Sequence, residues 1–185
     1  MSKEIEIRYK LNNKESLIKW LNKSAHMIGT SHHIDTYYNN KFNSFIKDTD
    51  HIYKWLRIRK EDSNITLNYK HWLPEGQIIR TYCDEYELQL SSSETMEEIL
   101  IKLGFEVFII VDKWRSIWKY KDCEIAIDSV VTLGDYIEIE YKGKNENDIQ
   151  SINEYLHNVL KELPADIGEE DFGGYGFKLI KMKYN

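Results

Sequence analysis

Several features are scarce in this chain, and each scarcity argues against a class of protein. The 185 residues include only two cysteines, Cys83 and Cys123, which lie far apart and without metal-ligand spacing. They therefore argue against a disulfide framework and a zinc site. With two prolines, nine glycines and no repeat or linker, the chain is expected to form one domain over residues 1–185. No apolar run approaches the roughly 20 residues that a membrane-spanning helix needs.

A surplus of basic residues is also missing. The 25 lysines and arginines stand against 31 acids, for a net charge of -6, which argues against binding to duplex nucleic acid. The start, Met1-Ser2-Lys3-Glu4, has no apolar core of a signal peptide. We therefore expect a cytoplasmic protein with neither a nucleic-acid nor a membrane partner, and a homodimer is left open.

The chain does contain charge at every second position of its predicted strands. In the stretch Glu4–Leu11, the side chains of Glu4, Glu6, Arg8 and Lys10 lie on one side of a strand, and apolar side chains lie on the other. Seven further stretches predict strands: His32–Tyr38, Tyr53–Lys60, Thr66–Lys70, Ile78–Leu90, Phe108–Tyr120, Glu124–Val130 and Tyr136–Lys142.

Helical periodicity predicts a helix ending near Ala25, a second running from about Thr95 to Leu103, and a third over Glu146–Leu163. Mostly hairpin connections between the strands favour an α+β fold, an eight-stranded antiparallel β-barrel covered by helices, over a doubly wound sheet. The late stretch Gly173–Gly176 lacks the lysine and context of a phosphate loop, so we interpret it as a flexible closing segment.

Side chains of both charges gather on the predicted strand faces. If the apolar faces pack outward against helices, these charges fill the lumen, where they must be paired or bound to ions. Arginine forks suit polyphosphate oxygens, and clustered carboxylates suit Mg²⁺ or Mn²⁺. The inverse arrangement is a lipocalin-like barrel with an apolar lumen, and periodicity alone does not separate the two. The acids are Glu4, Glu6, Glu85, Glu87, Asp128, Glu138 and Glu140, and the bases are Arg8, Lys10, Arg57, Arg59, Lys70, Lys113 and Arg115.

The order of these charges resembles the motifs of the CYTH, or triphosphate tunnel metalloenzyme, superfamily, especially its branch related to class IV adenylyl cyclases. Nearly the whole chain is covered by the resemblance. The matching motifs are Glu4-Ile5-Glu6-Ile7-Arg8, Asp35-Thr36-Tyr37, Leu56-Arg57-Ile58-Arg59, Leu67-Asn68-Tyr69-Lys70, Glu85-Tyr86-Glu87, Lys113-Trp114-Arg115, Asp128 with Leu133-Gly134 and Glu138-Ile139-Glu140, and Gly174-Tyr175 with Leu179.

The resemblance implies a tunnel in which bases hold a triphosphate and acids hold one or two divalent metals, Mg²⁺ or Mn²⁺. It implies that Arg57, Arg59, Lys70, Lys113 and Arg115 clamp phosphate oxygens, with Arg8 and Lys10 as further bases. It implies Glu4, Glu6, Glu138 and Glu140 as metal ligands, with Glu85, Glu87 and Asp128 binding a second metal, orienting water or supporting the bases. Lys113 is the candidate for steering cleavage, and Glu85 and Arg8 are further catalytic candidates.

Three departures from the family pattern stand out. Arg8 replaces a lysine, Cys83 stands where an arginine is often found, with Arg80 as a possible substitute, and His71-Trp72 replaces a Gly-Pro.

The resemblance leaves three functions open. A metal-dependent triphosphatase is favoured, acting on inorganic triphosphate, thiamine triphosphate or a nucleoside triphosphate. A class IV adenylyl cyclase would use the same charges and also need an adenine pocket. A non-catalytic polyphosphate-binding barrel would not call for so many carboxylates.

Overall fold

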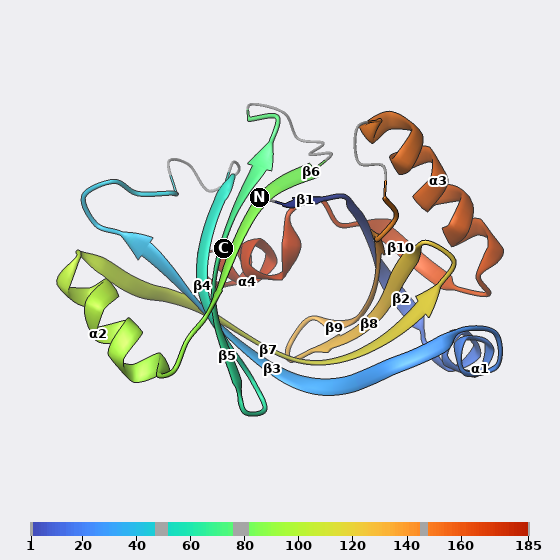
Figure 1. Ribbon diagram of the computed structural model, residues 1–185, viewed down its shortest axis with the longest axis horizontal. Coiled ribbons are helices and arrows are strands. Elements are labelled where there is room, and N and C mark those ends of the chain that lie inside the picture. The colour runs from blue at the N-terminus through green and yellow to red at the C-terminus, as the bar shows by residue number, and fades with distance from the viewer. Residues whose placement is uncertain (1, 47–51, 76–81, 145–147, 185) are drawn as a thin grey trace.

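The computed structural model describes residues 2–46, 52–75, 82–144 and 148–184. Within these ranges the chain forms ten strands and four helices (Figure 1). The strands are β1 (Ser2–Glu4), β2 (Glu6–Asn13), β3 (His26–Asn40), β4 (Lys54–Glu61), β5 (Asn64–Leu73), β6 (Tyr82–Gln89), β7 (Phe105–Tyr120), β8 (Cys123–Val130), β9 (Gly134–Tyr141) and β10 (Asp166–Glu170). The helices are α1 (Glu15–Ser24), α2 (Ser93–Lys102), α3 (Ile149–Glu162) and α4 (Gly174–Tyr184).

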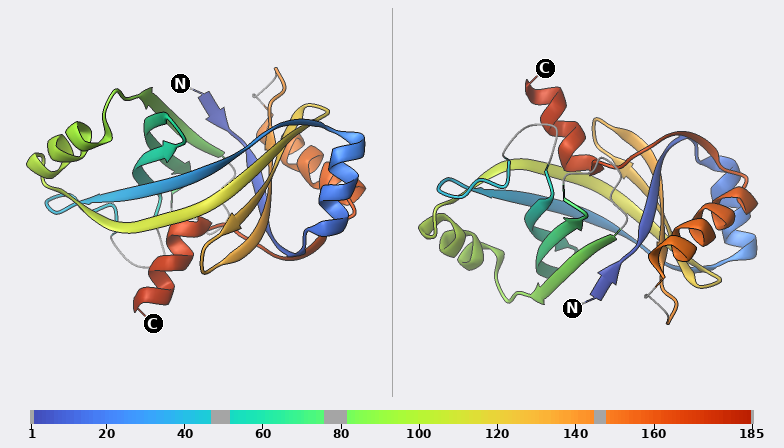
Figure 2. Two further views of the ribbon diagram at one scale, coloured as in Figure 1. Left: turned by 90° about the horizontal axis from the view of Figure 1, so that it is seen from below. Right: turned by 90° about the horizontal axis from the view of Figure 1, so that it is seen from above.

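All strand pairs are antiparallel, in the order β1-β6-β5-β4-β3-β7-β8-β9-β2-β10. The sheet is curled around a hollow (Figure 1), and β3 and β7 run side by side along its length (Figure 2). Its hydrogen-bonded ladder does not close into a complete barrel, because β1 and β10 are its two edges. The first segment of the chain links the two ends of the strand order, since β1 pairs with β6 and the following strand, β2, pairs with β9.

The predicted α+β antiparallel class is confirmed, but the predicted count of eight strands is wrong. The stretch Glu4–Leu11 is divided at Ile5 because its two parts pair with different strands. In addition, β10 adds a short edge strand to β2 that sequence periodicity did not predict. Arg80 and the start of the predicted strand Ile78–Leu90 lie outside the described residues.

The apolar faces of the strands turn outward against the helices. Leu17 and Leu21 of α1 and Leu156 of α3 are fully buried against Ile137 and Ile139 of β9 in one cluster. A second cluster packs under α2. The charged faces therefore line the hollow, and the alternative of an apolar lumen is excluded. Among the described helices, none is both long enough and apolar enough to pass through a bilayer.

The prediction of a flexible glycine-rich tail is wrong. Residues Gly174–Tyr184 form α4, whose Tyr175 and Ile180 are buried in one cluster with Trp55. The glycines serve close packing, because a Cβ on Gly176 would lie 2.9 Å from the Trp55 ring. Gly174 has a φ of +80°, which a side chain would strain. The tail is thus an ordered part of the cavity wall.

Candidate active site

The hollow of the sheet contains a cavity of about 510 Å³ with a strongly ionic lining. Most of the charged residues expected in the lumen are brought together there, from strands at both ends of the sheet. The expected residues that line it are Glu4, Glu6, Arg8, Arg57, Arg59, Lys70, Glu85, Glu87, Lys113, Arg115, Glu138 and Glu140.

Lys10 is a predicted base that does not line this cavity. In register it opposes Tyr136 at the start of β9, next to the β8–β9 turn, so it lies farther along β2 than Arg8. Its ammonium contacts the carbonyl oxygen of Leu133 and lies 4.6 Å from the centre of the Tyr136 ring. The shared face on β2 did not reveal that the strand extends past the cavity.

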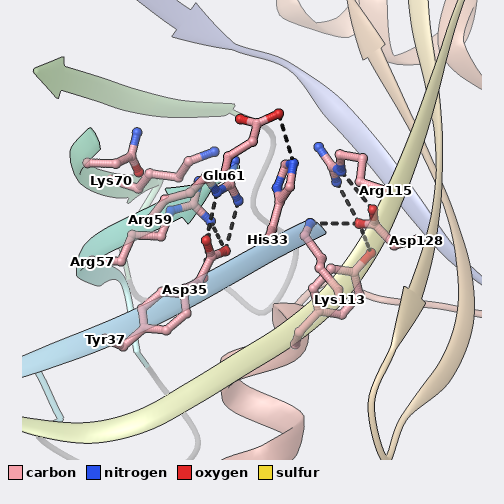
Figure 3. A network of polar contacts seen from close by, with 12 residues as sticks. His33, Asp35, Tyr37, Arg57, Arg59, Glu61, Lys70, Lys113, Arg115 and Asp128 are labelled. Atoms are coloured by element: carbon pink, nitrogen blue, oxygen red, sulfur yellow. Dashed lines mark hydrogen bonds and ion pairs between the residues drawn. The ribbon is translucent and has the colours of Figure 1, made fainter. Parts of the chain in front are cut away.

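Asp35 anchors the two arginines of β4 (Figure 3). The Arg59 guanidinium donates to Asp35 through Nε at 2.6 Å and Nη2 at 2.8 Å, and Arg57 donates through Nη1 at 2.9 Å. Asp35 is only 1% exposed. Burial raises its pKa, but attraction to Arg57 and Arg59 outweighs burial and holds the pKa well below its ordinary range. The arginine fork is therefore fixed in position before any ligand arrives.

The Asp35 contacts predict a large loss of stability in Asp35→Asn, which leaves both guanidinium groups without their buried counter-charge. We expect the free energy of unfolding to fall by about 3 kcal/mol at pH 7. Because the folded-state pKa of Asp35 is depressed, the difference is full above about pH 5 and shrinks as the pH falls below about 4. Urea unfolding at several pH values measures it, with the exposed Asp122→Asn as the matched control. A loss no larger than that of the control would contradict the anchoring role.

Asp128 anchors the two bases of β7 in the same way. It accepts from Lys113 Nζ at 2.8 Å, from Arg115 Nε at 2.7 Å and Nη2 at 2.6 Å, and from the Tyr175 hydroxyl at 2.7 Å. Asp128 is completely buried and does not line the cavity. Its two oxygens are therefore occupied by cations and a phenol, which fits support of the bases rather than ligation of a metal.

Lys113 is a lysine of the cavity whose pKa is lowered. Burial and the neighbouring Arg115 lower its pKa to about 7, although attraction to Asp128 opposes the change. By contrast, the pKa of Lys70 is raised above its ordinary value, because contact with Glu4 outweighs its burial. Lys113 is therefore the lumen base that changes charge near neutral pH.

Four carboxylates face the bases from β1, β2 and β9. Glu6 is directly opposite Glu140 in the ladder, and Arg8 is opposite Glu138. The Arg8 guanidinium bridges Glu6 and Glu138, the latter at 2.8 Å, and Arg115 reaches Glu138 at 2.7 Å. Lys70 pairs with Glu4. Acids and bases of the cavity thus neutralise one another across it.

These four carboxylates have the chemistry to hold a divalent cation. Burial, repulsion from Glu138 and repulsion from Glu4 raise the pKa of Glu6 well above its ordinary value, despite attraction to Arg8. Burial and repulsion from Glu4 raise the pKa of Glu140 to about 7. A divalent cation bound by oxygen ligands would relieve this repulsion. Within the described ranges, however, no three such side chains already converge as a ready-made metal site, because Arg8 and Lys70 stand between them.

The two remaining acids that were predicted for the lumen and line the cavity lie on β6. Asn68, only 1% exposed, donates to Glu85 and, at 3.4 Å, to Glu87. Lys70 lies 3.6 Å from Glu85. Cys83, which stands in the place of an arginine, donates its thiol to Glu4 at 3.0 Å. Glu85 and Glu87 therefore form a separate acidic pair next to Lys70.

Sequence reasoning did not place Asp35 or Tyr175 among the site residues. Tyr175 donates to Asp128, and the Arg8 guanidinium carbon lies 4.9 Å from the centre of its ring. The signals were in the motifs themselves, in Asp35-Thr36-Tyr37 and in Gly174-Tyr175. Both were missed because a charge count by strand face does not show which acid holds which base.

The fold and the residues that line the cavity together define a class of protein. In this class an antiparallel sheet curls around an ionic tunnel, and its apolar face packs outward against helices. Residues 2–168 match the model of the CYTH domain, and the chain belongs to this family, as the motifs predicted.

The chain is similar in sequence to one relative and in structure to others. A Methanocaldococcus jannaschii protein named "Putative adenylate cyclase MJ0240" is 32% identical over 161 residues, which cover 86% of this chain and 89% of that protein. The structure of the PH1819 protein from Pyrococcus horikoshii has a TM-score of 0.79 at 25% identity, covering 97% of this chain and 99% of the other. A Hippeastrum structure, described as a putative adenylyl cyclase with a dominant triphosphatase activity, has a TM-score of 0.65 at 15% identity, covering 99% and 96%. This last likeness concerns the fold alone.

Proposed function

We propose that the protein is a divalent-metal-dependent phosphohydrolase that acts on a triphosphate bound in the ionic cavity. One observation carries the proposal. Two pairs of basic side chains, each held by a buried aspartate, face a group of four carboxylates across one cavity. Asp35 fixes Arg57 and Arg59 on one side, and Asp128 fixes Lys113 and Arg115 on the other.

The bases bind and orient the phosphate chain in this proposal. Arginine forks match phosphate oxygens in a bidentate geometry, and the ammonium of Lys113 adds a compact charge. Because the Asp anchors keep these groups in place, little reorganisation is required when negative charge develops on the transferred phosphoryl group.

The acids bind the counter-ion of the substrate. Glu4, Glu6, Glu138 and Glu140 would hold Mg²⁺ or Mn²⁺, and the bound cation would offset negative charge on the phosphate chain. Since Arg8 and Lys70 now pair with Glu4, Glu6 and Glu138, binding would be an exchange of partners, in which the bases turn to phosphate and the acids turn to the metal. Neither exchange is favourable alone, because each would leave buried charges unpaired.

The alternative is an adenylyl cyclase, which the name of the Methanocaldococcus jannaschii relative favours. Cyclisation uses the same charges but requires the ribose 3′-hydroxyl in line with the cleaved bond. Hydrolysis needs only water there, and the charged side chains described above suit phosphate oxygens rather than a nucleobase. We therefore place hydrolysis first.

Product analysis separates the candidates. The protein is incubated with inorganic triphosphate and with ATP, each with Mg²⁺ or Mn²⁺, and the products are resolved. Release of orthophosphate is the expected result. Cyclic AMP with pyrophosphate would replace the proposal with the cyclase, and binding of triphosphate without any product would replace it with a non-catalytic polyphosphate-binding barrel.

A further inference from the structure

His33 of β3 lies between the two pairs of basic side chains, Arg57 with Arg59 and Lys113 with Arg115 (Figure 3). It precedes Asp35 by two residues, so the two side chains share the inner face of the strand. In the ladder with β7 its direct partner is Lys113. Both side chains are buried, each residue being 2% exposed. Directly opposed residues of an antiparallel pair have side chains within reach of each other.

Hydrogen bonding fixes which imidazole nitrogen of His33 carries the proton. The Ser31 hydroxyl donates to Glu61 Oε1 at 2.7 Å, so its single proton is used. His33 Nε2 lies 2.7 Å from the Ser31 oxygen and 3.1 Å from Glu61 Oε1, and it must therefore be the donor. A neutral ring protonated on Nε2 has a bare lone pair on Nδ1.

That lone pair is buried without a hydrogen-bond partner among the described residues. Burying an acceptor in this way is costly unless it is used in some state of the protein. The charged groups that face His33 are Asp35 on its own strand, Arg59 and Glu61 on β4, and Lys113 and Arg115 on β7. Burial and the nearby Arg59 lower the pKa of His33 to about 4, so the ring is neutral at physiological pH.

The Lys113 ammonium has further N–H donors that could bond to this acceptor. An ammonium carries three donors, and the hydrogen bond described for Lys113 is the one to Asp128 Oδ2 at 2.8 Å. A buried acceptor that lacks a donor therefore lies directly across the ladder from a buried donor group that is not saturated.

We propose that His33 is a positioning residue whose Nδ1 accepts a hydrogen bond from the Lys113 ammonium when that ammonium turns from Asp128 toward a bound phosphate. The inference rests on the proposed function, since the phosphate is that of the proposed substrate. His33 keeps the ammonium oriented and protonated during this movement. Asp128 holds Lys113 at one end of it, and His33 supports Lys113 at the other.

The test compares two substitutions of His33 that differ in the acceptor. His33→Leu removes it, whereas His33→Asn places an amide oxygen close to the position of Nδ1. The matched control is His32→Leu, on the outer face of the same strand, where His32 pairs with Asp112 and stacks on Trp114. The measurements are the pKa of the Lys113 ammonium by NMR with triphosphate bound, and the pH dependence of kcat for phosphate release.

In His33→Leu we expect the pKa of Lys113 to fall by about one unit and the alkaline limb of kcat, which reports the substrate complex, to move to lower pH by the same amount. In His33→Asn and His32→Leu both quantities should stay close to wild type. If leucine prevents folding, His33→Gln, which replaces the Nε2 contact but has no acceptor at Nδ1, takes its place.

An unchanged Lys113 pKa in His33→Leu would overturn the inference, and so would equal shifts in His33→Leu and His33→Asn. The NMR measurement needs binding but no turnover. The wild-type protein could therefore bind triphosphate without releasing phosphate while the Lys113 pKa still falls in His33→Leu and not in His33→Asn. That result would disprove the hydrolase and retain the His33 contact.

Discussion

Lys113→Met is expected to lower the rate of triphosphate hydrolysis by about 10²–10³-fold, because it removes a fixed positive charge from the place where negative charge develops. Methionine preserves the length of the side chain, so its packing beside Tyr175 is largely retained. The folded-state pKa of Lys113 is lowered to about 7, so its ammonium is charged below that pH and loses its proton above it. In the wild type, kcat/KM should therefore decline as the pH rises through about 7.

Lys113→Arg gives the sharpest control for this explanation. Arginine stays charged at every accessible pH, so the alkaline decline should be absent in this variant, even if its geometry lowers the maximum rate. Lys119→Met, on an exposed position of the same strand, should behave as wild type. Initial rates between pH 5.5 and 9 measure all three variants. Full activity in Lys113→Met, or an alkaline decline that persists in Lys113→Arg, would remove Lys113 from the proposed site.

Glu6→Gln is expected to abolish most metal-dependent turnover, with a loss of about 100-fold or more at limiting Mg²⁺. Burial and the neighbouring acids Glu138 and Glu4 raise the pKa of Glu6 despite its pairing with Arg8, and a cation bound there would offset this repulsion. The fold should survive the substitution, because Arg8 keeps its pair with Glu138 at 2.8 Å.

Metal titrations of turnover distinguish this effect from general damage. For Glu6→Gln the Mg²⁺ concentration at half-maximal rate should rise by at least about tenfold, whereas unfolding by urea should be little changed. Glu169→Gln, at an exposed position of β10, is the matched control. An unchanged metal requirement in Glu6→Gln would remove Glu6 from the proposed metal ligands.

Much of this architecture follows from the sequence because side chains alternate along strands. Alternation at Glu4, Glu6 and Arg8 predicted one charged face, and the structure places that face in the cavity. It could not decide between a charged lumen and an apolar one. That choice depends on where α1 and α3 pack, and their apolar stripes cover the outer faces of β2 and β9.

Contacts between distant strands could not be predicted from periodicity. Asp35 meets Arg59 and Asp128 meets Arg115 because of ladder register, which is set by many pairings together. The glycines near Tyr175 suggested flexibility, but glycine is also needed where a helix packs closely on an aromatic ring. Lys10 shares the strand face of Arg8 but lies beyond the cavity. Alternation along a strand predicts which side of the sheet a side chain lies on, but not how far along the strand the cavity extends.

The central claim is that acids and bases of one cavity exchange partners when the metal and a triphosphate bind together. The most direct test is calorimetric titration of Mn²⁺ with and without a non-hydrolysable triphosphate analogue, and of the analogue with and without Mn²⁺. We expect each ligand to increase the affinity of the protein for the other, by the same factor of at least about tenfold. Independent binding of the two, or binding of the analogue that Mn²⁺ does not strengthen, would contradict it.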